Sequence, residues 1–223
     1  MCPVSNTQNS FPSLELYVII DECLLSTTRV EDALEKALMG GADAIQFRAK
    51  RLSKRGYYEM AVRLLSHARH MSKPFFVNDH LDVALAIGAD GVHLGQDDFP
   101  CHAARRLTPK GMMIGVSSHC VEQAIRAAAD GANYIAVGPV FPTTTKDKPE
   151  PVVGLGMISK VKARIGAVPL VAIGGINRDN VSEVVRSGAD GVAVASAVAL
   201  AYDPVAVAME LKHRIRLERE RVC

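Results

Sequence analysis

Amide, basic and acidic side chains recur at the ends of short apolar runs, where they could bind phosphorylated ligands. Gln46, Arg48 and Lys50 alternate at the end of one such run, so in an extended strand they would share a face. An amide and two cations on one face suit a phosphate ester or a diphosphate, because a guanidinium can bind two oxygens at once. A solvated run of charges continuing through Arg51 is the alternative, but the alternation starts inside an apolar strand, which favours ligand binding.

Two later apolar runs end in carboxylates. Asp79 follows Asn78 after the first of them, and Asp97 and Asp98 follow the second. Oxygen ligands without a supporting His or Cys suit Mg²⁺, which takes one or two carboxylates and leaves its other positions to water and substrate phosphate. Asp79 and Asp98 are the predicted metal ligands, although spacing alone does not separate Asp98 from Asp97. A lone carboxylate after a strand is also a common helix N-cap.

The roles of a histidine and a serine stay open at this level. His93 lies within an apolar run, and a hydrogen-bonded core histidine is at least as well supported as a catalytic one. Ser117 follows another run, where it could cap the next helix or face a substrate, and the two roles are equally supported. A Ser-His-Asp hydrolase is poorly supported, because the chain has no G-x-S-x-G motif.

Small and hydroxylic residues at three further strand ends suit an anion. Thr143 to Thr145 and Lys146 follow the apolar run 134–137, Gly174-Gly175 follow 169–173, and a small-residue turn occupies 195–197. Backbone N–H groups and a helix N-terminus hold phosphate in this way. A glycine pair can also simply permit a tight turn, but in a barrel the phosphate site is favoured.

A repeated phrase positions these residues. It occurs as GGADAIQFR (40–48), IGADGVHLG (87–95), DGANYIAVG (130–138) and SGADGVAVA (187–195), each a glycine turn followed by an apolar run. Glycine ends a helix in the left-handed conformation, and the next residues enter a strand. The spacings between successive alanines are 47, 43 and 57 residues, which suit two strand–helix units per repeat.

Four more apolar runs (16–20, 74–77, 112–116 and 169–173) lie between the copies and bring the strands to eight. They have the unbroken apolar character of buried parallel strands. Amphipathic segments alternate with the strands at 29–39, 56–71, 81–87, 101–107, 119–129, 154–165, 178–187 and 203–220. This order predicts a (β/α)8 TIM barrel, an α/β fold, as a single domain over 14–223 after an N-terminal tail at 1–13. The rival is an open doubly wound sheet, which the missing G-x-G-x-x-G disfavours.

Composition excludes several classes of protein. The 223 residues are 48% hydrophobic and 22% charged, with a net charge of +2 and no basic stripe before the C-terminal helix, so nucleic-acid binding is not expected. The chain contains no run of about 18 apolar residues, so no membrane span is expected. Residues 1–12 show no targeting signal. The five scattered cysteines form no C-x-x-C pair, which favours a reducing, cytoplasmic location.

One segment is predicted to move. Residues 143–153 (TTTKDKPEPVV) are long, polar and punctuated by proline. Such loops frequently close over a bound substrate, so we expect a mobile lid here.

Seven ordered motifs resemble those of the thiamine-phosphate synthases. They are QFRAK (46–50), ND (78–79), HLGQDD (93–98), GVSSH (115–119), GPVFPTTTK (138–146), AIGGI (172–176) and GVAVASA (191–197). The resemblance runs from about Leu16 to Ala201. It implies a barrel enzyme of thiamine biosynthesis with two phosphorylated small-molecule substrates. The enzyme would join hydroxymethylpyrimidine diphosphate to thiazole phosphate, giving thiamine phosphate and diphosphate.

The resemblance also implies a role for each matched residue. The pyrimidine diphosphate would be bound by Gln46, Phe47, Arg48, Ala49, Lys50, Asn78, Ser117 and Lys146, of which Ser117 and Lys146 would be catalytic. The thiazole phosphate would be bound by Thr143, Thr144, Thr145, Gly175, Ala195 and Ser196. Mg²⁺ would be bound by Asp79 and Asp98, a choice that excludes Asp97.

The implied mechanism is dissociative. Mg²⁺ and the basic groups would stabilise the departing diphosphate, and the thiazole nitrogen would attack the remaining cation without a general base. Two alternatives are an isomerase of the thiazole phosphate, which would need the phosphate cradle but neither the metal pair nor Q-x-R-x-K, and a non-catalytic sensor of phosphorylated ligands. The oligomeric state stays open, with a homo-oligomer included.

Overall fold

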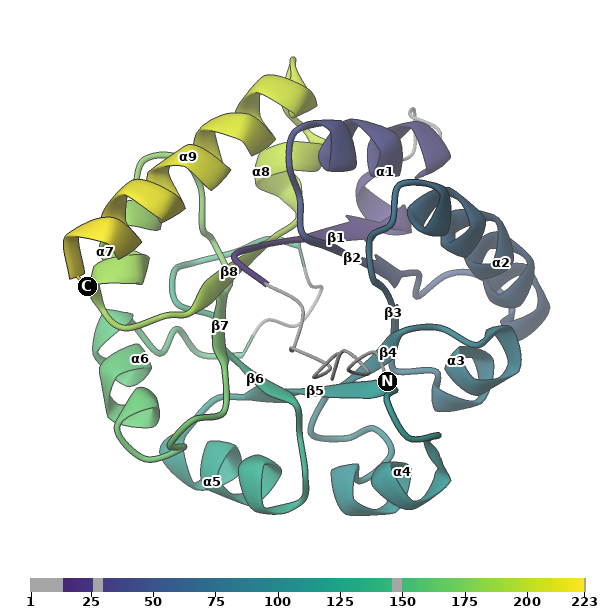
Figure 1. Ribbon diagram of the computed structural model, residues 1–223, viewed down its shortest axis with the longest axis horizontal. Coiled ribbons are helices and arrows are strands. Elements are labelled where there is room, and N and C mark those ends of the chain that lie inside the picture. Colours follow the sequence, from purple (N-terminus) through teal and green to yellow (C-terminus); the bar gives the residue numbers. More distant parts are fainter. Residues whose placement is uncertain (1–13, 26–29, 146–149, 223) are drawn as a thin grey trace, which may run out of the picture.

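Eight parallel strands form a closed barrel, paired in chain order from β1 round to β8 and back to β1 (Figure 1). The computed structural model describes residues 14–25, 30–145 and 150–222. The strands are β1 (Leu16–Asp21), β2 (Ala44–Arg48), β3 (Phe75–Asn78), β4 (Gly91–Leu94), β5 (Met113–Ser118), β6 (Tyr134–Val137), β7 (Leu170–Ile173) and β8 (Gly191–Val194). The predicted TIM barrel is confirmed, whereas the predicted tail at 1–13 lies outside the described residues.

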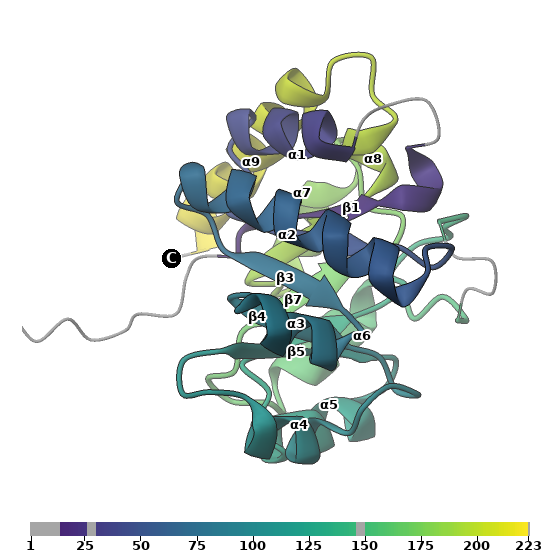
Figure 2. The ribbon, with the colours of Figure 1, turned by 90° about the vertical axis from the view of Figure 1, so that its right-hand side faces the viewer.

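Helices alternate with the strands and surround the barrel (Figure 2). They are α1 (Val30–Met39), α2 (Lys54–His70), α3 (Leu81–Ile87), α4 (Cys101–Leu107), α5 (Val121–Ala129), α6 (Leu155–Lys162), α7 (Val181–Arg186), α8 (Ser196–Ala199) and α9 (Pro204–Val222). The short helix α8 and a 3₁₀ turn, η1 (Glu22–Leu24), were not expected from the sequence. Within the described ranges, no helix combines the length and apolar character needed to cross a bilayer.

The repeated glycine phrase makes the same pair of hydrogen bonds in each of its four copies. Gly88, for example, has φ 64° and ends α3, as a left-handed C-cap requires. Two residues later, Asp90 donates its N–H to the Phe75 carbonyl at 3.1 Å and accepts the Phe75 N–H on its carboxylate at 2.9 Å. Asp43, Asn133 and Asp190 make the same two hydrogen bonds to Leu16, Ile114 and Leu170. The repeat therefore joins each even-numbered strand to the start of the preceding odd-numbered strand.

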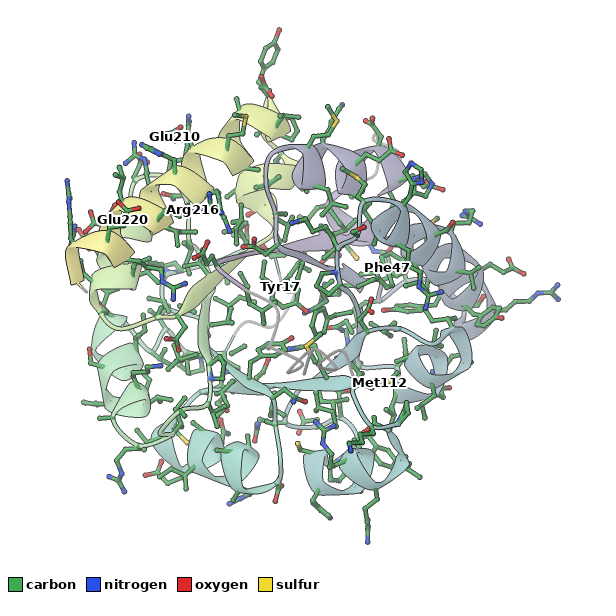
Figure 3. The ribbon with its side chains drawn as sticks, viewed as in Figure 1. Tyr17, Phe47, Met112, Glu210, Arg216 and Glu220 are labelled. Atoms are coloured by element: carbon green, nitrogen blue, oxygen red, sulfur yellow. The ribbon has the colours of Figure 1, made fainter. Side chains whose placement is uncertain are left out.

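Alternate residues of each strand face two different apolar layers. The barrel interior holds a smaller cluster that includes Tyr17, Phe76 and Tyr134, whose rings meet edge to face at centroid distances of 5.2–5.8 Å. A larger cluster, which includes Phe47, fills the layer between strands and helices. Figure 3 shows Tyr17 directed into the barrel and Phe47 beside α2. Inward-facing positions that continue past these aromatic rings therefore reach the carboxyl-end mouth of the barrel.

Candidate active site

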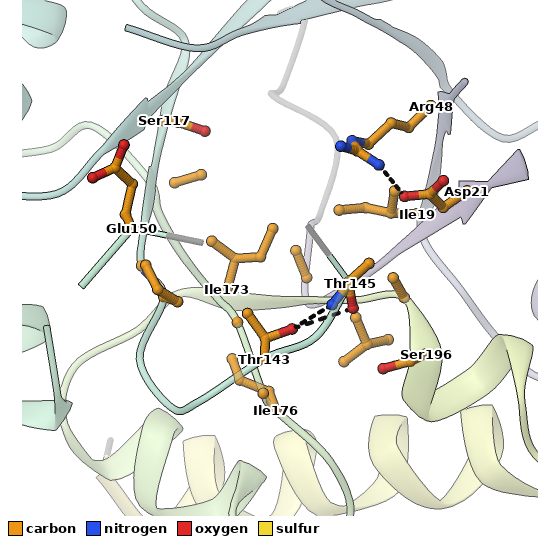
Figure 4. Close-up of a pocket in the computed structure, with 18 of the residues that line it drawn as sticks. Ile19, Asp21, Arg48, Ser117, Thr143, Thr145, Glu150, Ile173, Ile176 and Ser196 are labelled. Carbon is orange, nitrogen blue, oxygen red and sulfur yellow. Dashed lines mark hydrogen bonds and ion pairs between the residues drawn. The ribbon is translucent and has the colours of Figure 1, made fainter. Parts of the chain in front are cut away.

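A pocket opens at the carboxyl ends of β1, β2 and β5 to β8, at the mouth of the barrel (Figure 4). Seven of the residues predicted from the sequence line it: Arg48, Ser117, Thr143, Thr145, Gly175, Ala195 and Ser196. They come from segments up to about 150 residues apart in the chain, and parallel strands bring their ends to one rim. The structure therefore brings Arg48 and Ser117 together with the neutral part of the predicted site. Other described residues of the prediction do not line this pocket, among them Gln46, Lys50, Asn78, Asp79 and Asp98.

The neutral side of the pocket is built from main chain and small side chains. The Thr143 and Thr145 hydroxyls lie 3.2 Å apart, and the Thr145 N–H donates to Thr143 Oγ1 at 3.3 Å. Gly175 has φ 66°, and a Cβ there would lie 2.5 Å from the Pro142 carbonyl oxygen, so the loops after β6 and β7 meet only because this residue is glycine. Thr144 is exposed and outside the pocket lining.

The turn after β8 closes the same side. Ala195 caps α8, and Ser196 is its first residue. Both residues line the pocket, beside Gly175. The first N–H groups of a helix have no partner within that helix, so those of this turn are available to a ligand at the pocket edge. A neutral cradle of hydroxyls and main-chain donors suits a phosphate group.

The cationic side contains an ion pair that the sequence reasoning missed. Asp21 directly follows the predicted strand 16–20 and was given no role there, but it ends β1, and its side chain is fully buried. The Asp21 carboxylate accepts a hydrogen bond from Arg48, its neighbour in register on β2. The alternation that identified Gln46 and Arg48 would have identified Asp21, because it shares a face with Tyr17 and Ile19.

A buried hydrogen-bonded chain links four strands to Ser117. His93 Nε2 lies 2.9 Å from Ser117 Oγ, and His93 Nδ1 lies 2.9 Å from the Tyr134 hydroxyl. The Tyr134 hydroxyl donates to that of Tyr17 at 3.1 Å, and the Gln46 amide donates to Tyr17 at 3.0 Å. Burial raises the pKa of both tyrosines, so their hydroxyls stay protonated. Gln46 therefore lies beneath the pocket and is connected to it through this chain.

The two predicted metal ligands lie together beside this chain. Asp79 has a φ of 61° and donates its N–H to the His93 carbonyl at 2.8 Å. Asp98 accepts the Gly95 N–H at 2.8 Å. Burial, and then a hydrogen bond and charge from Asp79, raise the pKa of the Asp98 carboxyl. Asp98 therefore faces Asp79, whereas Asp97 is exposed.

This acidic pair fits a magnesium ion. Its donor set is two carboxylates, which are the hard oxygen ligands that Mg²⁺ takes in small number. Lys50 forms an ion pair with Asp79 and is half exposed, so a cation competes for one of these carboxylates. Across the described part of the chain, no group of three or more His, Cys, Asp or Glu side chains could hold a metal. Softer or fully protein-ligated metals are therefore poorly matched to this pair.

The remaining predicted residues differ in what their side chains can reach. Asn78 is buried at the end of β3, in register with His93. Phe47 and Ala49 belong to the apolar layer between strands and helices, and the ring centroids of Phe47 and Tyr57 lie 4.8 Å apart. Their side chains therefore face away from the mouth, and only their main chain could serve a ligand there. Lys146 and the centre of the predicted lid at 143–153 lie outside the described residues.

Two further polar residues of the pocket were not predicted. His119 follows β5, and its Nδ1 lies 2.6 Å from the Gly138 carbonyl oxygen. Glu150 lines the pocket from the loop after β6 (Figure 4). Glu150 gave no signal in the sequence, because it lies in a polar stretch outside any strand. His119 directly follows the predicted strand end at Ser117-Ser118, which is the signal that could have identified it.

Known proteins resemble this chain in sequence over most of its length. Residues 16–198 match the family model described as "Thiamine monophosphate synthase". A thiamine-phosphate synthase of Chloroflexus aurantiacus is 43% identical over 92% of this chain and 94% of its own length. One from Methanoculleus marisnigri is 46% identical over 90% and 95%.

A solved structure shows the same relationship. Thiamine phosphate pyrophosphorylase from Pyrococcus furiosus superposes with a TM-score of 0.84 at 40% identity, covering 93% of this chain and 98% of that one. The family model alone spans well over half of the sequence. The chain therefore belongs to the thiamine monophosphate synthase family of transferases.

Proposed function

We propose that this protein joins hydroxymethylpyrimidine diphosphate to thiazole phosphate, releasing thiamine phosphate and diphosphate. The observation that carries the proposal is the division of one barrel mouth into two unlike halves. Arg48, which lines the pocket, and the Asp79–Asp98 pair, which follows β3 and β4 outside the pocket lining, form a charged half, and the loops after β6, β7 and β8 form a neutral cradle. Two phosphorylated substrates could bind side by side there, with Ser117 between them.

The neutral cradle would take the thiazole phosphate. Thr143 and Thr145 offer hydroxyls, and the main chain at Gly175, Ala195 and Ser196 surrounds the same space. Main-chain donors bind phosphate without introducing a mobile charge. A phosphate that is only anchored, and does not react, is well served by such a rigid neutral site.

The charged half would take the diphosphate, which must leave with its charge compensated. Asp79 and Asp98 would hold Mg²⁺, and when bound this ion supplies compensation for the charge of the departing diphosphate. Arg48 lies close enough to the pocket to contact the same anion. Lys50 would turn from Asp79 towards the diphosphate as the ion replaces it. Lys146 is proposed to add a further cation from the loop after β6.

The carbon–oxygen bond would break before the new carbon–nitrogen bond forms. The aminopyrimidine stabilises the methylene cation that remains, and the thiazole nitrogen attacks it with its own lone pair. Such a reaction needs no general base. Ser117, Gln46 and the cradle would align the two reactants, which is where a well-oriented site gains most of its rate.

The direct test is a coupling assay with each component omitted in turn. Purified protein with both substrates and Mg²⁺ should release thiamine phosphate and diphosphate, and chelation should abolish turnover. Asp98→Asn should lower kcat/KM by at least about 100-fold, roughly 2.7 kcal/mol of barrier. The matched control is Asp97→Asn, which changes the exposed neighbour and should retain wild-type activity and Mg²⁺ dependence. Absence of product at every Mg²⁺ concentration, or equal loss in both variants, would contradict the proposal.

A further inference from the structure

We infer that Asp21 is a positioning residue that holds the Arg48 guanidinium in place for an anionic ligand. The inference rests on the proposed function, because it assigns the ligand as the diphosphate of the pyrimidine substrate. Asp21 and Arg48 are adjacent in register on β1 and β2, and both line the pocket. The Asp21 side chain is fully buried, and that of Arg48 is 14% exposed.

Each oxygen of the Asp21 carboxylate has one donor. Oδ1 accepts the Cys23 N–H at 3.0 Å, and this hydrogen bond also caps the turn η1. Oδ2 accepts a hydrogen bond from Arg48 Nη1. The carboxylate is therefore held by the main chain on one side before it contacts the guanidinium on the other. A carboxylate buried inside a barrel is retained only with such partners, because burial of an unpaired charge is costly.

This arrangement leaves most of the guanidinium available to a ligand. Arginine carries five N–H donors in a planar fork, and Asp21 accepts from one of its nitrogens. Figure 4 shows that nitrogen directed at Asp21, while the rest of the guanidinium faces the open centre of the pocket. Fixing the fork before binding removes the cost of ordering a long side chain when the anion arrives.

The rival explanation is a purely structural ion pair between two strands. The two explanations predict opposite changes in the affinity for the anion when Asp21 is lost. A structural pair that merely neutralises Arg48 would, on loss of Asp21, leave more positive charge for the anion and tighten its binding. A positioning residue would, on its loss, release the guanidinium and weaken binding.

The variant Asp21→Asn separates these outcomes. Asparagine is isosteric and keeps an acceptor for the Cys23 N–H, but it removes the charge that holds Arg48. We expect the KM for the pyrimidine diphosphate to rise about tenfold, equal to about 1.4 kcal/mol, with the KM for thiazole phosphate unchanged. The control is Glu22→Gln, which neutralises the next carboxylate outside the pocket lining and should leave both constants unchanged.

A double-mutant cycle shows whether Asp21 acts through Arg48. Binding of inorganic diphosphate in the presence of Mg²⁺ is measured by calorimetry for wild type, Asp21→Asn, Arg48→Met and the double variant. We expect Arg48→Met to weaken binding strongly in the wild-type background and little in the Asp21→Asn background. Thermal unfolding of each variant separates this effect from loss of fold.

Three results would overturn the inference: tighter or unchanged diphosphate binding in Asp21→Asn, equal rises in both KM values, or additive effects in the cycle. The calorimetric cycle needs no turnover. If wild-type protein makes no thiamine phosphate, the proposed function fails while the cycle still decides the role of Asp21.

Discussion

At the scale of single residues, His93 shows how a buried polar group can serve a site that it does not line. Its two ring nitrogens contact Ser117 and Tyr134 at 2.9 Å each, and the residue is 6% exposed. From the sequence, a core role for this histidine was at least as well supported as a catalytic one. The contacts favour a third description, in which His93 orients the Ser117 hydroxyl and is itself held by Tyr134.

Tyr134→Phe tests that description by removing one hydroxyl at constant ring volume. It deletes a hydrogen-bond partner of His93, so the Ser117 hydroxyl becomes less well oriented. We expect kcat/KM for the coupling reaction to fall about tenfold and the free energy of unfolding to fall by about 1 kcal/mol. Steady-state kinetics and urea unfolding measure the two effects.

The matched control for this change is Tyr58→Phe, since Tyr58 lies on α2 and is 43% exposed. It should alter neither quantity. Wild-type kcat/KM in Tyr134→Phe would show that the ring alone is sufficient and that the hydroxyl chain does not orient Ser117.

At the scale of elements, the four glycine–alanine–Asx turns explain how short strands find their register. Each turn ends a helix and returns two hydrogen bonds to the start of the preceding strand. The strands of this barrel are only four to six residues long, and a slip of one residue would exchange inward and outward faces. The turns therefore protect the placement of every side chain at the mouth.

Asp90→Ala should remove one of these hydrogen bonds between a turn and a strand and leave the site intact. The Asp90 carboxylate accepts the Phe75 N–H at 2.9 Å, at the amino end of the barrel and far from the pocket. We expect the free energy of unfolding to fall by about 1–2 kcal/mol, with kcat and KM unchanged. Urea unfolding and the coupling assay are the measurements.

A surface carboxylate provides the comparison for this variant. Asp32→Ala removes an exposed i,i+4 pair with Lys36, which should cost less than about 0.5 kcal/mol. Equal losses in the two variants, or a changed KM in Asp90→Ala, would contradict the assigned role of the turns.

At the scale of the whole molecule, one lysine joins the first strand to the last helix. Lys212 of α9 is 8% exposed and contacts Glu15, at 2.7 Å, and Asp43. Arg216 and Arg219 add further contacts to Glu15. Both carboxylates precede strands, so this cluster lies at the amino end of the barrel, opposite the pocket.

The cluster should make stability depend on pH on the acid side. Burial alone would raise the pKa of Glu15, but the hydrogen bonds and charges of Lys212, Arg216 and Arg219 lower it on balance. Because the folded-state pKa of Glu15 lies below its unfolded value, the unfolded chain binds more protons than the folded chain when the pH lies between these two pKa values. The stabilisation from Glu15 is therefore present above its unfolded pKa, about 4.3, and is lost as the pH falls through the lower folded value.

Lys212→Met should reduce both the stability and this pH dependence. It leaves two partly buried carboxylates without their main cationic partner, and we expect a loss of about 3 kcal/mol at pH 7. Urea unfolding between pH 3 and pH 7 should show a shallower acid-side slope than wild type. An unchanged slope would mean that the Arg216 and Arg219 contacts alone lower the pKa of Glu15. Activity at low temperature should persist, since the pocket lies at the other end.

The residue pattern alone was sufficient for the barrel and for much of its mouth. Apolar runs of four to six residues, regular amphipathic segments and the Gly-Ala-Asx repeat are local signals set by backbone geometry, and they predicted all eight strands. Alternation along β2 placed Gln46 and Arg48 on the inner face for the same reason. The direction of a side chain relative to its own strand is a local property, so the sequence can state it.

Barrel closure decided the contacts between strands. Asp98 rather than Asp97 faces Asp79 because the Gly95 N–H holds its carboxylate in the loop after β4. Asp21 contacts Arg48, and Ser117 contacts His93, because strands 20 or more residues apart are brought into register. These pairings depend on the geometry of the closed sheet, in which each strand selects its neighbours. For that reason only the tertiary structure assigned partners to the polar residues that the sequence had placed at the strand ends.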